Sequence, residues 1–354
     1  MSHRIVTPLI LALQGEAASS FHNRYPEEWA KLTHDAVEDA AAAGEDVVFF
    51  MRSAWTKSPA HTPLFWLGDQ LVSWDSNDGL RSIITGALSS GLTGHAFTHS
   101  DIGGYNVETE LGKSMYYVRS PELLKRWTEM AAFGFALFRT HIGSSTTSLD
   151  AQVYDSSDSM AHFGKFAKIF GHLSAMRRQL MRDASRKGLP MIRPLAMQFG
   201  YDALVWDITE AYMVGEELLV APCLHEGAVE VRVYLPESSG AWIHLWSGVQ
   251  VDADRGTYVA VPAPIGFPPV FFRPSSTYGR SLYKFLADSN LSDTVPSRWQ
   301  LRTSRLTRPS ETSPPQEQLL HPSACSYLLS PFAIVLLLCV LFSASMIAWR
   351  VSLS

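Results

Sequence analysis

The sequence predicts an α/β fold: the second half of a (β/α)8 TIM barrel, then an antiparallel β-sandwich, a linker and a C-terminal hydrophobic helix. Three observations predict this fold. Apolar runs of strand length alternate with helical patterns up to about residue 190. Short runs of alternating apolar and polar residues follow, up to about residue 288. A last apolar stretch near the C-terminus is long enough for one membrane span.

The barrel half is predicted from four strand–helix units. The strands are apolar on both faces, which is typical of a parallel sheet covered by helices. A closed barrel needs eight strands, so we expect the N-terminal half of the barrel to lie outside this chain. The predicted strands are 46–52, 63–69, 96–101 and 137–141, and the predicted helices are 25–44, 79–91, 120–133 and 158–187.

The bulk composition favours a globular chain. The 354 residues are 46% apolar and 18% charged, with a net charge of −5. No basic stripe is present, which argues against a nucleic-acid partner. The three cysteines form no C-x-x-C pair, so neither a zinc site nor a disulfide framework is supported. We therefore expect no metal and no cofactor.

Four domains or segments are predicted from the changes in pattern: a barrel half over 1–190, a β-sandwich over 191–288, a disordered linker over 289–325 and a helix over 326–350. The linker is rich in Ser, Thr, Pro and Arg. Residues 327–349 carry no charge, which predicts a membrane anchor or single span. A cleaved lipid-anchor signal and a buried core helix are the alternatives.

Polar residues follow the predicted strands at the same relative place. Arg52, Asp69, Asp101 and His141 each lie at the C-terminal end of a strand. In a β/α barrel this rim carries the chemistry. Asp69 follows the aromatic pair Phe65-Trp66, an environment that suits a proton donor, although a turn aspartate would have the same spacing.

A metal site is a weaker interpretation of one of these strands. His95, His99 and Asp101 share one face of a strand, because their spacing is even. Such an array does not by itself make a tetrahedral site. A metal-dependent barrel hydrolase therefore remains the third hypothesis for this chain.

At these positions the sequence resembles the catalytic barrel of glycoside hydrolase family 31. The motifs that carry the resemblance are Arg52, Trp66-Leu-Gly-Asp69, His99-Ser-Asp101-Ile-Gly-Gly and Arg139-Thr-His141, with Gly215-Glu-Glu-Leu-Leu-Val-Ala-Pro222 at the start of the C-terminal β-domain. The resemblance implies that Asp69 is the acid/base. It also implies that Arg52, Trp66, Asp101, Tyr105 and His141 bind the sugar. Gln70 and Tyr105 are more similar to the sulfoquinovosidase branch of the family than to ordinary α-glucosidases.

The resemblance implies a retaining α-glycosidase whose substrate is an α-glucoside or an α-sulfoquinovoside. In the family's order of motifs, the nucleophile should fall at or just before residue 1, so we expect it to be missing from this chain. The first alternative is a catalytically inactive, membrane-tethered fragment that binds carbohydrate.

Overall fold

The computed structural model describes residues 18–44, 47–62, 64–107, 117–144, 149–238, 240–292 and 301–304. All of these residues fall within one structural unit, which spans residues 1–306. The predicted C-terminal helix lies outside the described residues. Within the described ranges, no helix combines the length and hydropathy needed to cross a membrane.

Four parallel segments lie side by side in the order of the sequence. Strands β1 (Leu64–Trp66) and β2 (Phe97–His99) form a parallel ladder. Single parallel bridges from Met51 to Phe65 and from Ile102 to Thr140 add one segment on each side. The parallel arrangement is therefore the one that the barrel prediction requires.

The two outer segments differ from the prediction. Residues 46–52 and 137–141 were expected to be full strands, but each contributes only one bridge. Among the described residues, each outer segment has a strand neighbour on one side only. A strand with only one neighbour forms about half of the ladder hydrogen bonds that a central strand forms. Fewer of its residues are therefore held in regular strand geometry.

Helices alternate with these segments. The first three are α2 (Ala18–Ala42), α3 (Leu80–Leu92) and α4 (Pro121–Gly134). Helix α4 begins where the sequence predicts it, because the Ser120 hydroxyl accepts a hydrogen bond from the Leu123 amide and Pro121 occupies the first turn.

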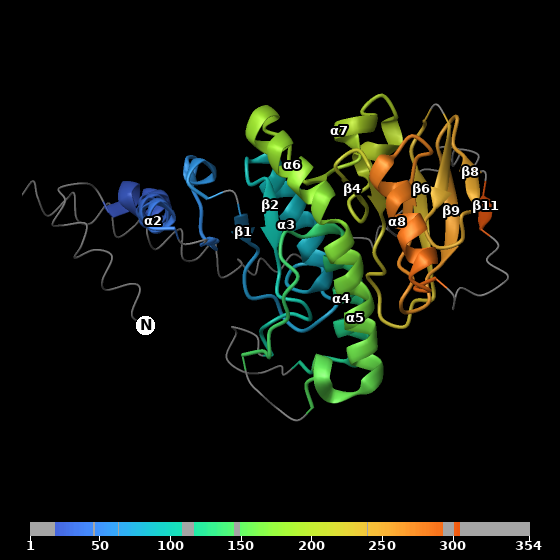
Figure 1. Ribbon diagram of the computed structural model, residues 1–354, viewed down its shortest axis with the longest axis horizontal. Coiled ribbons are helices and arrows are strands. Elements are labelled where there is room, and N and C mark those ends of the chain that lie inside the picture. The colour runs from blue at the N-terminus through green and yellow to red at the C-terminus, as the bar shows by residue number, and fades with distance from the viewer. Residues whose placement is uncertain are drawn as a thin grey trace, which may run out of the picture. The chain divides into compact units, whose positions relative to one another are not determined.

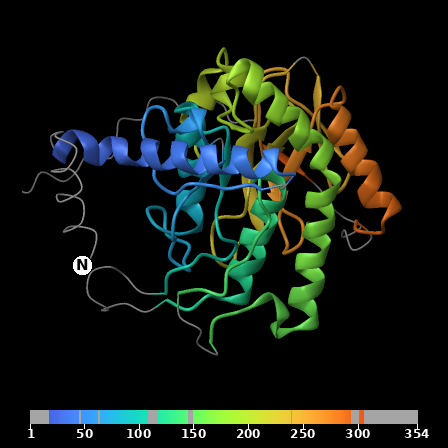
Figure 2. The ribbon, with the colours of Figure 1, turned by 60° about the vertical axis from the view of Figure 1, so that its left-hand side comes forward.

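The predicted helix 158–187 is two helices, α5 (Ser157–His172) and α6 (Ser174–Lys187). The break falls at Leu173, whose ψ of 4° departs from helical geometry. The buried Arg177 guanidinium donates hydrogen bonds to the carbonyls of Phe170, Ala132 and Phe135. This tertiary contact holds the turn, and the helical pattern of the sequence gives no sign of it. Helices α4 and α5 pack side by side (Figure 1 and Figure 2).

The second half of the chain forms two antiparallel sheets, as predicted. The six-stranded sheet has the order β3 (Ile192–Arg193), β4 (Tyr212–Val214), β5 (Leu218–Val220), β10 (Val270–Phe272), β7 (Ala241–His244), β8 (Gln250–Asp252). The three-stranded sheet has the order β11 (Arg302–Ser304), β9 (Thr257–Pro262), β6 (Glu230–Leu235). Short helices α7 (Ala196–Phe199) and η3 (Ala203–Asp207) precede β4, and α8 (Thr277–Asp288) follows β10.

One part of the predicted linker 289–325 is ordered in the structure. Residues Arg302–Ser304 form β11 and pair with β9. At these residues the structure has a short strand where the sequence predicted part of a linker. Pairing along the edge of β9 uses main-chain hydrogen bonds, which depend little on side-chain hydropathy, so polar residues can form it.

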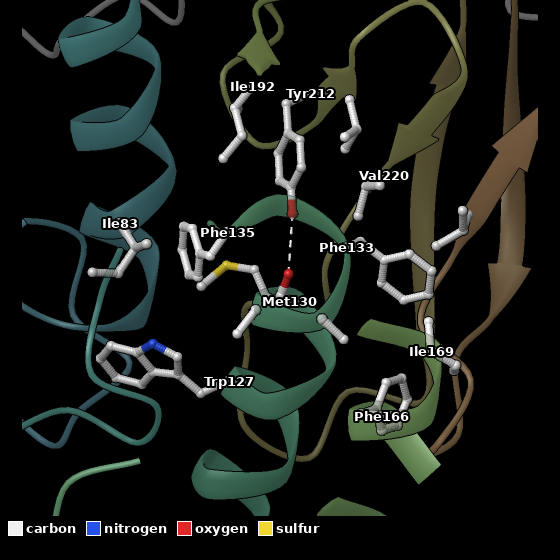
Figure 3. Close-up of a cluster of buried hydrophobic side chains, with 14 of the residues drawn as sticks. Ile83, Trp127, Met130, Phe133, Phe135, Phe166, Ile169, Ile192, Tyr212 and Val220 are labelled. Carbon is white, nitrogen blue, oxygen red and sulfur yellow. Dashed lines mark hydrogen bonds between the residues drawn. The ribbon is translucent and has the colours of Figure 1, made fainter. Parts of the chain in front are cut away.

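The central strands β4, β5 and β10 of the six-stranded sheet are buried on both faces, which is why they are almost wholly apolar. On β4, Tyr212 and Val214 join the core that contains the helices, whereas Met213 joins the core between the two sheets. Figure 3 shows Tyr212 extending from β4 toward α4, where its hydroxyl lies 3.5 Å from the Met130 carbonyl oxygen. Gly134 makes this approach possible, since a Cβ there would lie 2.8 Å from the Tyr212 hydroxyl.

Candidate active site

The ends of the four parallel segments meet around Phe50. The centroid of its ring lies 6.2 Å from that of Trp66 and 6.0 Å from that of His99. Arg139 Cζ lies 5.8 Å from the Phe50 centroid. Residues from all four strand ends are thus gathered at one place. Phe50 is half-buried, and in the sequence it is one apolar residue within an apolar run, so nothing there marked it.

Asp69 pairs with Arg52. The Nη1 atom of Arg52 lies 3.2 Å from Asp69 Oδ2, and Arg52 Cζ lies 5.3 Å from the Trp66 ring centroid. The Asp69 side chain is 21% exposed and that of Arg52 is 59% exposed. The Asn106 side chain donates a hydrogen bond of 2.9 Å to the Asp69 carbonyl. The carboxyl group is therefore held in a defined place but remains open to solvent.

Asp101 is buried among groups that favour its charged form. Its Oδ1 accepts a hydrogen bond from Arg139 Nη2 and lies 3.3 Å from His99 Nε2. Burial opposes ionisation, but the hydrogen bonds from His99 and Arg139 outweigh it and hold the pKa of Asp101 below its ordinary value. Asp101 is therefore a carboxylate at neutral pH, which suits an acceptor of hydrogen bonds and does not suit a proton donor.

Tyr105 and His141 form a second pair. Their ring centroids are 4.8 Å apart at an angle of 79° between planes. The Gly143 amide donates a hydrogen bond to His141 Nδ1, so in a neutral ring the proton is on Nε2. The Tyr105 amide donates to the Gln70 carbonyl, which ties this pair to the loop after Asp69.

The structure places all six predicted site residues at this rim. Contacts join Arg52 to Asp69 and Trp66, and Tyr105 to His141, whereas Asp101 is connected to the others through Arg139 and Phe50. The contacts made by Phe50, Asn106 and Arg139 do not follow from the sequence pattern. Arg139 lies within the Arg139-Thr-His141 motif, which could have drawn attention to it.

The His95, His99 and Asp101 array does not gather around one point. The His95 ring packs against the Phe65 ring, with the centroids 4.5 Å apart and 34° between the ring planes, while His99 faces Asp101. In the described part of the chain, no group of three or more His, Cys, Asp or Glu residues is arranged to hold a metal ion.

The β-domain contains a cavity of about 410 Å³. Residues of β6, of β9 and of the loop before β4 line it, including Glu210, Arg232 and Tyr258. None of the six predicted site residues borders this cavity. The strand ends instead form a more open surface, as the exposure of Arg52 and Arg139 indicates.

Parallel strand ends that carry charged side chains, followed by an antiparallel β-domain, define the class of β/α-barrel proteins with an additional β-domain. Comparison with known families agrees. Residues 10–182 match the glycosyl hydrolases family 31 TIM-barrel domain, and residues 188–277 match the glycosyl hydrolase family 31 C-terminal domain. The chain belongs to glycoside hydrolase family 31.

Several relatives in this family are sulfoquinovosidases. The Escherichia coli enzyme is 38% identical over 264 residues, which cover 75% of this chain and 37% of the relative. The Agrobacterium fabrum enzyme is 39% identical over 266 residues, which cover 75% and 38%. A solved family 31 sulfoquinovosidase from E. rectale, in complex with an aza-sugar inhibitor, has a TM-score of 0.70 and 34% identity, covering 80% of this chain and 39% of that one. The chain thus spans about two fifths of the length of these relatives.

Proposed function

We propose that this chain is part of a retaining α-glycoside hydrolase that cleaves α-sulfoquinovosides, with Asp69 as the acid/base. The observation that carries the proposal is the placement of Asp69 against Arg52, which itself lies over the Trp66 ring, at the rim where the four strand ends meet. The similarity to sulfoquinovosidases supports the substrate class. α-Glucosides are the second candidate substrate, because they differ from α-sulfoquinovosides mainly at C6 of the sugar.

In this proposal Asp69 donates a proton to the glycosidic oxygen and then accepts one from the attacking water. In the free protein, Arg52 Nη1 lies 3.2 Å from Asp69 Oδ2. A sugar hydroxyl that accepts the Arg52 hydrogen bond would draw the guanidinium away from Asp69. Substrate binding would then leave Asp69 Oδ2 available to the glycosidic oxygen.

Unpaired polar atoms at the rim support sugar binding. In the described part of the chain, the buried Trp66 Nε1 has no acceptor and the buried Asp101 Oδ2 has no donor. A buried polar atom without a partner costs about 1–3 kcal/mol, so groups of this kind gain when a ligand supplies the missing hydrogen bond. Sugar hydroxyls both donate and accept, and His141 Nε2 would provide a further donor.

Retention requires a second carboxyl group about 5 Å from the acid/base, which acts as the nucleophile. Asp101 is engaged by Arg139 and His99, so we do not assign it this role. We propose that the nucleophile is a carboxylate from outside these 354 residues, together with the other half of the barrel.

The domain bounds 1–190, 191–288, 289–325 and 326–350 and the membrane anchor over residues 327–349 are part of the same proposal. The anchor rests on hydropathy alone. Flotation of the full chain with lipid vesicles, compared with a chain that ends at residue 326, tests it. Equal recovery of both chains in the aqueous fraction would contradict it.

Titration calorimetry with sulfoquinovose and with glucose tests the sugar site on the 354-residue chain. We expect sulfoquinovose to bind more tightly. Hydrolysis of the 4-nitrophenyl α-glycosides of both sugars is then measured for two proteins. One is this chain, and the other is a longer form that includes any coding sequence upstream of Met1. We expect turnover only in the longer form, and Asp69→Asn should remove it while sugar binding persists. Binding without turnover in both forms would favour the inactive carbohydrate-binding fragment.

A further inference from the structure

Arg119 is a buried arginine whose side chain bonds to main-chain carbonyls on three segments. It is 1% exposed and lies immediately before the N-cap of α4. Its Nε donates to the Ala151 carbonyl at 2.7 Å, Nη1 to those of His141 at 2.8 Å and Gly104 at 3.4 Å, and Nη2 to that of Ile142 at 3.2 Å.

Two of these segments carry the Tyr105–His141 pair. The Gly104 carbonyl is the group directly before Tyr105, and the His141 carbonyl belongs to the other member of the pair. The guanidinium therefore joins the two loops through their main-chain carbonyls, and the side-chain rings of the same two loops also contact each other. Gly103 allows the close approach: its φ is +94°, and a Cβ there would lie 2.8 Å from Arg119 Cδ.

We propose that Arg119 is a positioning residue that sets the relative placement of Tyr105 and His141, and thereby the affinity of the site for the sugar. This inference rests on the proposed function, since it assigns a supporting residue to the same site. Arginine suits the task because its planar group offers five donors in fixed directions. A lysine ammonium has only three donors around one atom, so it cannot reach all four carbonyls at once.

A second buried arginine provides a matched control. Arg177 is 7% exposed, and its guanidinium donates to the carbonyls of Ala132, Phe135 and Phe170. These acceptors lie on α4, on the residue after it and on α5, so this group does not touch the loops of Tyr105 or His141. Replacing either arginine should destabilise the fold by leaving several buried carbonyls without a donor.

The test compares Arg119→Met, Arg119→Lys and Arg177→Met in the full chain. The first readout is the nuclear Overhauser contact between the Tyr105 and His141 rings, assigned with Tyr105→Phe and His141→Gln. The second is the affinity for sulfoquinovose. We expect both methionine variants to unfold at lower urea concentration. Only Arg119→Met should lose the ring contact and bind the sugar about tenfold or more weakly, with Arg119→Lys intermediate.

Retention of the ring contact and of wild-type affinity in Arg119→Met would overturn the proposal, as would equal losses in Arg177→Met. If Arg119→Met does not fold, Arg119→Lys decides by the same two readouts. If the wild-type chain binds no sugar, the proposed function fails, and the ring contact alone then decides the role of Arg119.

Discussion

Arg52 and Asp69 belong to different strand ends, yet Nη1 of the first lies 3.2 Å from Oδ2 of the second. The Arg52 side chain is more than half exposed. An ion pair this open to water contributes little to folding, typically about 0–1 kcal/mol. Its placement beside Trp66 therefore adds little to the stability of the fold.

Arg52→Met should weaken sulfoquinovose binding without unfolding the chain. Losing a charged hydrogen bond to the sugar costs about 1.5–3 kcal/mol, which is roughly a 10- to 150-fold loss of affinity. Calorimetric titration measures it. Arg81→Met is the control, because Arg81 makes a surface pair with Glu210 at 2.8 Å. Equal effects of the two substitutions on affinity would contradict a role for Arg52 in the site.

Ser100→Ala should destabilise the protein by about 1–3 kcal/mol. The fully buried Trp127 of α4 donates a hydrogen bond of 2.9 Å from Nε1 to Ser100 Oγ, directly between His99 and Asp101. The substitution leaves that donor buried without an acceptor. Urea unfolding measures the loss, and a double-mutant cycle with Trp127→Phe isolates the pair. Additive effects in the cycle would show that the hydrogen bond contributes nothing.

Gly134→Ala should destabilise the protein although alanine is the better helix former. The new methyl group would lie 2.8 Å from the Tyr212 hydroxyl. Overpacking of this kind costs about 1–3 kcal/mol. Tyr212→Phe removes the hydroxyl and should recover part of the loss in the double variant, as judged by urea unfolding. No recovery would mean that the clash lies elsewhere.

The stability of the β-domain should depend on His244 in mild acid. Burial lowers the pKa of His244 from 6.5 to about 3. As the pH falls below 6.5, the unfolded chain binds a proton that the folded chain does not. The free energy of unfolding therefore decreases by about 1.4 kcal/mol per pH unit from this group alone. Its stabilising contribution is complete above pH 6.5 and is lost as the pH falls toward 3.

His244→Asn removes this titration and keeps a polar atom near Ser247 Oγ, which lies 2.9 Å from Nδ1 in the native protein. Between pH 6.5 and 4.5 the wild type should lose about 2–3 kcal/mol more than the variant. The exposed His225→Asn is the control. Equal slopes of unfolding free energy against pH for all three proteins would contradict the prediction.

The sequence predicted the order of the helices and strands and the polar residues at the C-terminal ends of the parallel strands, because both follow from local patterns. The apolar runs that end in Arg52, Asp69, Asp101 and His141 place polar groups at one end of parallel strands, wherever those strands lie in space. The Ser120-Pro121 start of α4 is likewise a local signal. The family resemblance then assigned roles to these positions.

What the sequence could not predict depends on contacts between distant residues. The break at Leu173 is held by Arg177, strand β11 exists through its pairing with β9, and the outer barrel segments lose regularity for lack of a second neighbour.

The sequence by itself therefore determined the family, the alternation of elements and the residues at the rim. Only the tertiary structure decided that Phe50 lies at the centre of the strand ends and that Arg119 joins the loops of Tyr105 and His141. The physical reason is that a pattern records which side of an element is apolar. A hydrogen bond between two loops depends instead on where the whole chain places them.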